Sequence, residues 1–204
     1  MRPNPKASRV ALKLITPPEA EPVSLDEAKL HLRVWDDAED RYIVSLIQAS
    51  RQWCENYLRR SLITTKWRQT FGSLPRGGVI ELARPPLVEV TRFEYVNDSG
   101  VTTTVPAELY SVDIDSEAGR IVRGHDLTWP TVRTTGVTAA VTVEFNAGYG
   151  PTAASVPDSI RHAMLLMMGH WYENRSPVVV GSQVNSVPRS AEALLATQRW
   201  GSYP

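Results

Sequence analysis

Two side chains in the last third of the chain have the types and the spacing to do chemistry. His170 and Glu173 stand three residues apart in the stretch "MLLMMGHWYENR", which runs from Met164 to Arg175. Residues three apart on a helix project to neighbouring positions, so the imidazole and the carboxylate could share a metal ion or a proton. A metal-dependent hydrolase that uses His170 and Glu173 is therefore one function to weigh.

The number of available ligands argues against a metal at this position. A zinc site needs three or four ligands, and the other histidines are badly placed to complete the set. His162 lies eight residues before His170, about 80° around the same helix, while His31 and His125 belong to other predicted elements. We therefore interpret His170 and Glu173 as the polar end of a packing helix, and we predict no metal site and no catalytic residue.

Other possible sites have simpler structural explanations. The one cysteine, Cys54, stands on an apolar helical stripe, where burial would keep its thiol protonated and inert. The stretch "DIDSEAG" begins like a calcium loop at Asp113, but Ala118 stands where glycine is required and Gly124 where a bidentate glutamate belongs. The glycines of "RGGV" and "AGYGP" lack the spacing of a phosphate-binding loop. The sequence predicts no cofactor.

The balance of charge bears on nucleic-acid binding. Lys plus Arg and Asp plus Glu number 22 each, so the chain has no excess of cations to neutralise phosphates. Aromatic residues interleaved with arginines, as in "KWRQ" and "TRFEY", could stack on bases, which keeps a nucleic-acid-binding module as a second alternative. The sequence has neither a signal-peptide core nor a run of about 18 apolar residues, so we expect a soluble protein made inside a cell, without a membrane partner.

Four stretches have helical patterns. Ser24 and Glu27 form a capping box that predicts a helix over about residues 25–34. The clearest helix follows over the stretch "DRYIVSLIQASRQWCENYLRRSL", and a third, apolar around much of its circumference, starts near Pro157. A fourth, short helix is predicted in "RSAEALLATQRW". The residues expected to pack the second helix against the third are Leu46, Ile47, Trp53, Tyr57, Met164, Met168 and Trp171.

Between these helices the pattern changes to short β-rich runs separated by turn residues. The six runs cover residues 66–71, 78–82, 90–96, 109–114, 119–122 and 139–149. The order predicts an α+β fold, in which an antiparallel β-domain, residues 65–150, is inserted into a helical bundle formed by residues 20–64 and 156–175.

The remaining segment, residues 176–204, has the composition of a docking arm. Its valines follow no clear period, and its last helix has only Leu194, Leu195 and Trp200 to bury. An isolated helix of about twelve residues is marginal in water, so the segment needs a partner.

Several stretches, taken in order, resemble the head-tail connector or adaptor family of tailed bacteriophages and gene transfer agents. The similarity covers about residues 20–197 and is carried by "PVSLDEAKLHLRV", "DRYIVSLIQASRQWCENYLRRSL", "TKWRQTF", "PPLVEVTRFEYVNDSG", "FNAGYG", "VPDSIRHAMLLMMGHWYENR" and "VPRSAEALL". The resemblance implies a non-enzymatic virion protein of the neck, made in the cytoplasm of a bacterial host. About a dozen copies would form a ring below the portal and extend the DNA channel.

The resemblance also implies a set of partners. These are the portal protein, further copies of the same chain, tail or head-completion proteins, and double-stranded DNA that passes without specific binding. In this family the C-terminal region is where contact with the portal is expected. We therefore predict that Leu194, Leu195 and Trp200 contact the portal or a neighbouring subunit.

Overall fold

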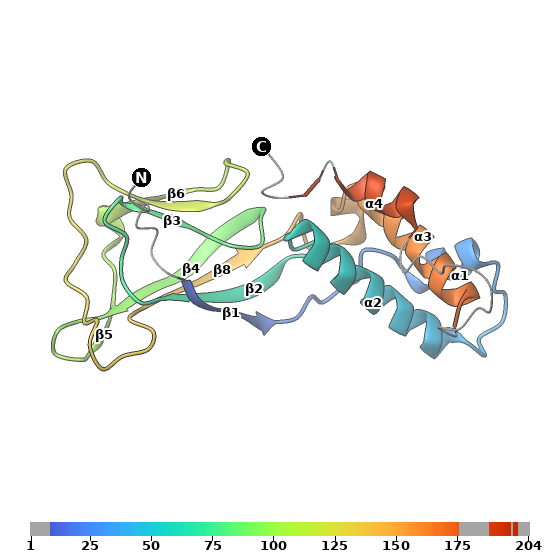
Figure 1. Ribbon diagram of the computed structural model, residues 1–204, viewed down its shortest axis with the longest axis horizontal. Helices are drawn as coiled ribbons and strands as arrows, with labels where there is room; N and C mark the ends of the chain where they lie inside the picture. Colours follow the sequence, from blue (N-terminus) through green and yellow to red (C-terminus); the bar gives the residue numbers. More distant parts are fainter. Residues whose placement is uncertain (1–8, 176–187, 197, 200–204) are drawn as a thin grey trace. The chain divides into compact units, whose positions relative to one another are not determined.

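The computed structural model describes residues 9–175, 188–196 and 198–199 of the chain and divides into two compact units. The β unit comprises Met1–Pro17 and Thr64–Gly148, and the helical unit comprises Pro18–Ile63 and Tyr149–Pro204. Within the described residues, the β-strands all lie in the first unit and the α-helices in the second (Figure 1). The α+β class predicted from the sequence is confirmed.

The helices of the helical unit begin and end where local chemistry requires. Their bounds are α1 Leu25–Leu32, α2 Asp40–Leu58, α3 Asp158–Glu173 and α4 Arg189–Ala196, with a short 3-10 helix, η2, at Ala153–Ser155. The Ser24 Oγ accepts a hydrogen bond of 3.1 Å from the Glu27 N–H, which caps α1 as the sequence predicts. Pro157, whose ring fixes a helix-compatible φ, precedes α3. Within the described residues, none of these helices is both long and apolar enough to cross a lipid bilayer.

One apolar core holds the helical unit together. Helix α3 packs against α1, α2 and α4, which explains why its sequence is apolar around much of its circumference. Of the residues expected to pack α2 against α3, four are buried in this core, Leu46, Ile47, Met164 and Met168, and three are partly buried against it, Trp53, Tyr57 and Trp171. The Cys54 Sγ lies 3.9 Å from the Met167 Sδ at the centre of the α2–α3 contact.

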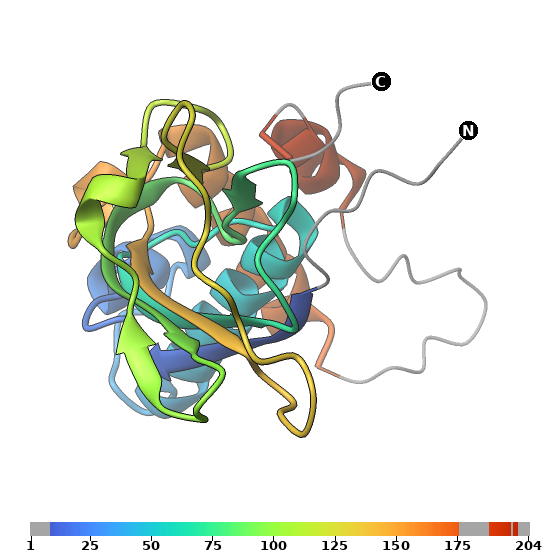
Figure 2. The ribbon, with the colours of Figure 1, turned by 90° about the vertical axis from the view of Figure 1, so that its left-hand side faces the viewer.

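The β unit contains two antiparallel sheets that enclose a second core (Figure 2). The five-stranded sheet has the order β1-β2-β8-β4-β5, and the three-stranded sheet has the order β3-β7-β6. The bounds are β1 Arg9–Thr16, β2 Thr65–Phe71, β3 Val79–Glu81, β4 Leu87–Val96, β5 Thr102–Thr104, β6 Tyr110–Asp113, β7 Arg120–Arg123 and β8 Val141–Ala147, with a 3-10 helix, η1, at Ala107–Leu109. The buried faces contribute Phe93 and Phe145 from the larger sheet and Ile80 and Ile121 from the smaller one.

Two strands were missed from the sequence. Strand β1 precedes the helices along the chain but pairs with β2, so that Lys13 faces Arg68 across the two strands. Strand β2 is some fifty residues away from β1, and no local sequence pattern indicates such a long-range pairing. Strand β5 is three threonines that pair with the end of β4, across a turn in which Asn97 Oδ1 accepts from the Val101 N–H at 3.0 Å.

Candidate functional site

The structure places His170 and Glu173 in the last turns of α3. The His170 carbonyl accepts hydrogen bonds from the Asn174 backbone N–H at 3.1 Å and from its Nδ2 at 2.8 Å, and so closes the helix. Glu173 is exposed at the rim of a pocket of about 420 Å³ between α1 and α3, whose other lining residues are His31, Leu32, Arg33, Gly169 and Tyr172. Among the described residues, no three His, Cys, Asp or Glu side chains gather closely enough to hold a metal ion. The metal-dependent hydrolase gains no support.

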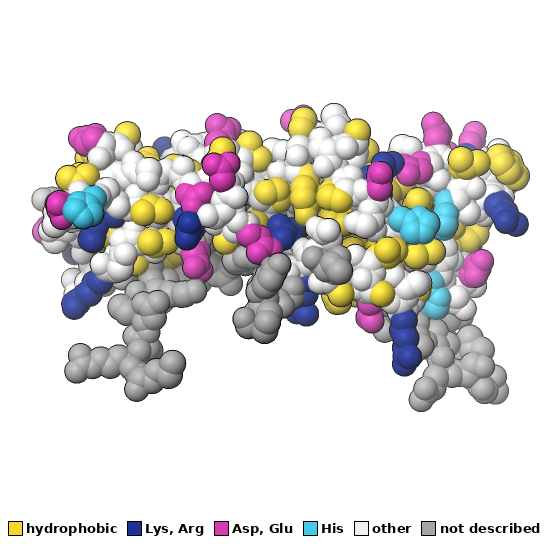
Figure 3. Space-filling model, turned by 90° about the horizontal axis from the view of Figure 1, so that it is seen from above, with side chains coloured by type: hydrophobic (Ala, Val, Ile, Leu, Met, Phe, Trp, Pro, Cys, Tyr) yellow, Lys and Arg dark blue, Asp and Glu magenta, His cyan; other side chains and the backbone are white. Residues whose placement is uncertain are grey.

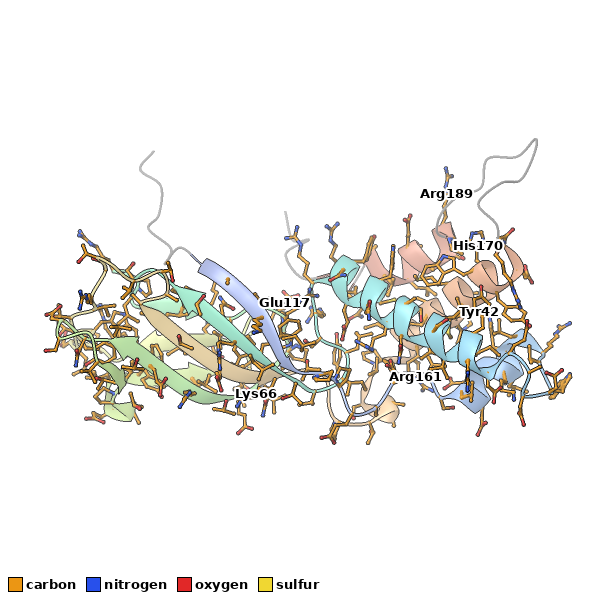
Figure 4. All side chains as sticks on the ribbon, turned by 90° about the horizontal axis from the view of Figure 1, so that it is seen from below. Tyr42, Lys66, Glu117, Arg161, His170 and Arg189 are labelled. Atoms are coloured by element: carbon orange, nitrogen blue, oxygen red, sulfur yellow. The ribbon has the colours of Figure 1, made fainter. Side chains whose placement is uncertain are left out.

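The stretch after His170 contains a polar clamp that ties the end of α3 to the start of α2. The Tyr172 hydroxyl donates to the carboxylate of Glu39, the residue before α2, and the Arg175 guanidinium bonds both Glu39 oxygens at 2.7 and 2.8 Å. The same guanidinium lies over the rings of Tyr42 and Tyr172, 4.5 and 4.7 Å from their centroids. Figure 4 shows Tyr42 and His170 toward the same end of the helical unit.

This clamp shifts the titration of its members. The hydrogen bond from Tyr172, followed by that from Arg175, lowers the pKa of Glu39 below its usual range, and contact with Glu39 raises the pKa of Tyr172. The carboxylate also stands at the N-terminus of α2, where a negative charge is favourable. The motif "HWYENR" therefore stabilises helix packing, and the paired carboxylate is held ionised for that purpose.

A second clamp fixes the other end of α3. Arg161 donates to both carboxylate oxygens of Glu27 on α1 at 2.7 Å, to the Pro22 carbonyl at 3.0 Å and to Asp158 at 3.2 Å (Figure 4). Sequence reasoning missed both arginines because their carboxylate partners lie more than 130 residues away along the chain. The detectable signals were an arginine in the first turn of α3, Arg161, and one just beyond its end, Arg175.

Cys54 and the Asp113 turn are structural, as the sequence analysis expected. Burial raises the pKa of the Cys54 thiol to about 12, so the reactive thiolate is absent at neutral pH. Asp113 accepts hydrogen bonds from the Asp115 and Ser116 N–H groups at 3.1 and 3.0 Å and pairs with Arg120 at 2.6 Å. Its oxygens are therefore used within the turn between β6 and β7.

The aromatic and basic residues of the β unit serve sheet packing. On β2, the indole of Trp67 donates to Thr65 Oγ1 at 2.9 Å, and its ring lies under Arg84 at 5.3 Å from the centroid. Phe93 on β4 is buried edge-on against Tyr110 and Trp129, with ring centroids 5.1 and 5.9 Å apart. Phe93 is therefore closed to a stacking base, and Trp67 is partly buried with Arg84 over its ring.

Several charges on the outer face of the larger sheet form ion pairs. Lys13, Arg68, Glu144 and Arg92 follow one another in register across β1, β2, β8 and β4. Glu144 is buried and pairs with Arg68 at 2.6 Å and with Lys66 at 2.9 Å, which lowers its pKa. On the face seen in Figure 3, positive and negative side chains are likewise interspersed. This distribution gives no support to a nucleic-acid-binding module.

The C-terminal helix differs from the prediction of an unpartnered docking arm. Ala191 and Leu195 on α4 are fully buried in the core of the helical unit, and Leu194 is partly buried against it. Beyond α4, the Arg60 Nε donates to the Gln198 carbonyl at 2.7 Å. The prediction that Leu195 waits for another protein is therefore wrong, because α3 provides the apolar surface that it needs. Trp200 and residues 176–187 of the predicted arm lie outside the described residues.

Comparison with known proteins identifies similar sequences and folds. Residues 22–84 match the model of the phage gp6-like head-tail connector protein family. No curated protein sequence matches the chain significantly. A chain from the neck of an empty gene transfer agent particle, obtained with C6 symmetry, is 23% identical with a TM-score of 0.75, over 93% of this chain and 95% of that one.

Two further structures show the same similarity. A chain from the virion of a native gene transfer agent particle is 24% identical with a TM-score of 0.75, over 92% of this chain and 94% of that one. A chain from a native neck with C12 symmetry is 22% identical with a TM-score of 0.68, over 93% and 94%. At these identities the shared property is the fold. The resemblance inferred from the motifs is confirmed: residues 22–84 match the phage gp6-like head-tail connector family, on a fold shared with gene transfer agent neck proteins.

Proposed function

We propose that this chain is a head-tail connector, a structural protein of the neck of a phage or gene transfer agent particle. The observation that carries the proposal is the agreement of two independent similarities. Residues 22–84 match the connector family, and 93% of the chain shares its fold with a neck protein. The connector match spans all of α1 and α2 and continues into the β unit, so it does not rest on one short motif.

In this role several copies form a ring below the portal and extend the channel through which DNA leaves the capsid. The similar neck structures have C6 and C12 symmetry, which supports a closed ring and favours twelve copies. The helical unit is the ring element in this proposal. The β unit is not a simple insertion in it, because β1 precedes the helices along the chain and pairs with β2. The portal and the tail or head-completion proteins are the expected partners above and below the ring.

We still predict that the C-terminal region contacts the portal, but through residues other than those expected from the sequence. Leu195 belongs to the subunit's own core, whereas Leu194 is only partly buried and the opposite side of α4 is exposed at Glu192 and Ala193. A docked α4 would present that side to a partner while its apolar side stays against α3.

The charge distribution is consistent with a passive conduit. The formal net charge of zero and the paired cations of the outer sheet face offer few strong contacts to phosphates, so DNA can slide past. Neither the metal-dependent hydrolase nor the nucleic-acid-binding module has an observation in its favour. The role proposed here is structural.

Deletion of the gene tests the proposal directly. Cells that lack the protein should produce DNA-filled capsids without tails, visible by negative-stain electron microscopy, and expression of the wild-type chain should restore tails. The His170→Ala variant is the matched control and should restore tails equally. Normal tailed particles in the deletion strain, or loss of function in the His170→Ala variant together with a bound metal in the wild type, would contradict the proposal.

A further inference from the structure

The largest exposed apolar side chains of the described helical unit lie at one end of it. Trp35 is 79% exposed and Leu30 is 65% exposed, although every other helix of this unit buries its large apolar residues or leaves them at most 39% exposed, as for Val44. Leu30 lies on α1 and Trp35 follows it in residues 33–39, here called the Trp35 loop. A tryptophan this exposed lacks the burial that its large ring could gain, so its position suggests a binding partner.

The Trp35 loop is held in a defined conformation. The Val34 N–H donates to the Lys29 carbonyl at 3.0 Å, and the Ala38 N–H donates to Asp36 Oδ1 at 3.0 Å. The Lys29 ammonium pairs with Asp37 at 2.6 Å and with Asp40, the first residue of α2, at 2.8 Å. Because the loop is already ordered, presenting Trp35 to a partner costs little conformational entropy.

The opposite end of α2 has a complementary character. Its 19 residues separate the two ends by about 27 Å. The far end, here called the arginine end, comprises Tyr57, Arg59, Arg60 and Arg199. The Arg199 guanidinium lies 5.3 Å from the Tyr57 ring centroid, Arg59 caps α2, and Arg60 donates to the Gln198 carbonyl. Tyr57 stacks on Trp53 at 5.0 Å, and both rings are only partly buried. Arg59 is exposed and pairs with no carboxylate among the described residues.

The two ends of the helical unit therefore differ in a way that suits head-to-tail association. The Trp35 loop presents an indole and the exposed carboxylates of Asp36 and Asp37, and the arginine end presents guanidinium groups and aromatic edges. A ring needs two different, mutually complementary surfaces on each subunit. Tryptophan and arginine are the side chains that most often dominate such interfaces, and an indole face attracts a guanidinium.

We propose that the Trp35 loop of one copy docks on the arginine end of α2 in the next copy of this chain, with Leu30 and Trp35 buried in the contact. The inference rests on the proposed connector function, and it adds the surfaces by which copies meet. It requires that neither surface be the contact with the portal or with another neck protein.

Photocrosslinking in assembled particles tests this contact. Benzoylphenylalanine replaces Trp35, and in a matched control it replaces Val101, which is 57% exposed on the β4–β5 turn of the other unit. Crosslinks from position 35 should join two copies of the chain and map by mass spectrometry to residues 53–60 or to Arg199. Crosslinks to another protein, crosslinks between two Trp35 loops, or no crosslink above the Val101 control would overturn the proposal.

Charge reversal provides a second readout that does not depend on the probe. Asp36→Arg and Arg59→Asp should each lower the number of copies incorporated per particle by about tenfold, and the double variant should recover most of it. Both side chains are exposed, so each single variant should stay folded, which thermal melting checks. Asp36→Arg also removes the hydrogen bond from the Ala38 N–H, and recovery in the double variant separates that local loss from a lost contact between copies. Single variants that assemble normally, or a double variant that recovers nothing, would overturn the contact. Absence of the wild-type chain from particles would instead refute the connector function itself.

Discussion

Two pairs of apolar residues in the helical unit lie in environments opposite to those that their sequences suggest. Leu194 and Leu195, in a segment too sparse to fold alone, are packed on the subunit's own core, with Leu195 fully buried. Leu30 and Trp35, next to a well-capped helix, are left in solvent. Amphipathic patterns show that a residue needs cover, but they do not say which surface provides it. The answer depends on the neighbouring helices: α3 packs against α4 and covers Leu195, whereas Leu30 and Trp35 stay exposed.

The largest expected effect is a difference between these two pairs in the free energy of unfolding. Leu195→Ala should lower the free energy of unfolding by about 2–5 kcal/mol, because it opens a cavity in a packed core. Trp35→Ala should change it by less than about 0.5 kcal/mol, because the side chain is already solvated. Urea denaturation followed by far-ultraviolet circular dichroism measures both. A stable Leu195→Ala variant, or a strongly destabilised Trp35→Ala variant, would reverse the comparison.

Helices and strands could be predicted from the sequence where the pattern that marks them lies within a few residues. The Ser24 cap, Pro157 before α3 and the alternating runs of the β unit each depend on residues within a few positions, and each marks an observed element. Strand β1 and the arginine clamps could not be found, because the partners of Arg161 and Arg175 are more than 130 residues distant. Pairings of that length follow from the fold and not from any window of sequence.

Glu144 should contribute to the response of the β unit to acid. Glu144 has a lowered pKa because Lys66 and then Arg68 bond its ionised form. The stability that this pairing contributes is present above the ordinary pKa of a glutamate and is lost as the pH falls from there through the lowered pKa. The Glu144→Gln variant should therefore have a lower thermal midpoint than the wild type at neutral pH. Its midpoint should also fall less steeply as the pH is lowered. If the thermal midpoints of the variant and the wild type fall equally with pH, Glu144 does not contribute to acid sensitivity.

The polar clamp at the end of α3 should give a smaller effect. Tyr172→Phe keeps the ring beside Arg175 but removes the hydroxyl that donates to Glu39, so the thermal midpoint should fall by less than in Leu195→Ala. His170→Ala is the matched control, since only the His170 carbonyl caps the helix, and its midpoint should fall least. A larger loss for His170→Ala than for Tyr172→Phe would mean that the imidazole has a role that the observed contacts do not explain.

A density map of the neck of assembled particles tests the central claim most directly. The account predicts a ring of copies directly below the portal, with twelvefold symmetry, into which the helical unit fits with the Trp35 loop of each copy against the next. A neck map in which no copy of this fold can be placed, from particles that contain the chain, would contradict its assignment as a connector.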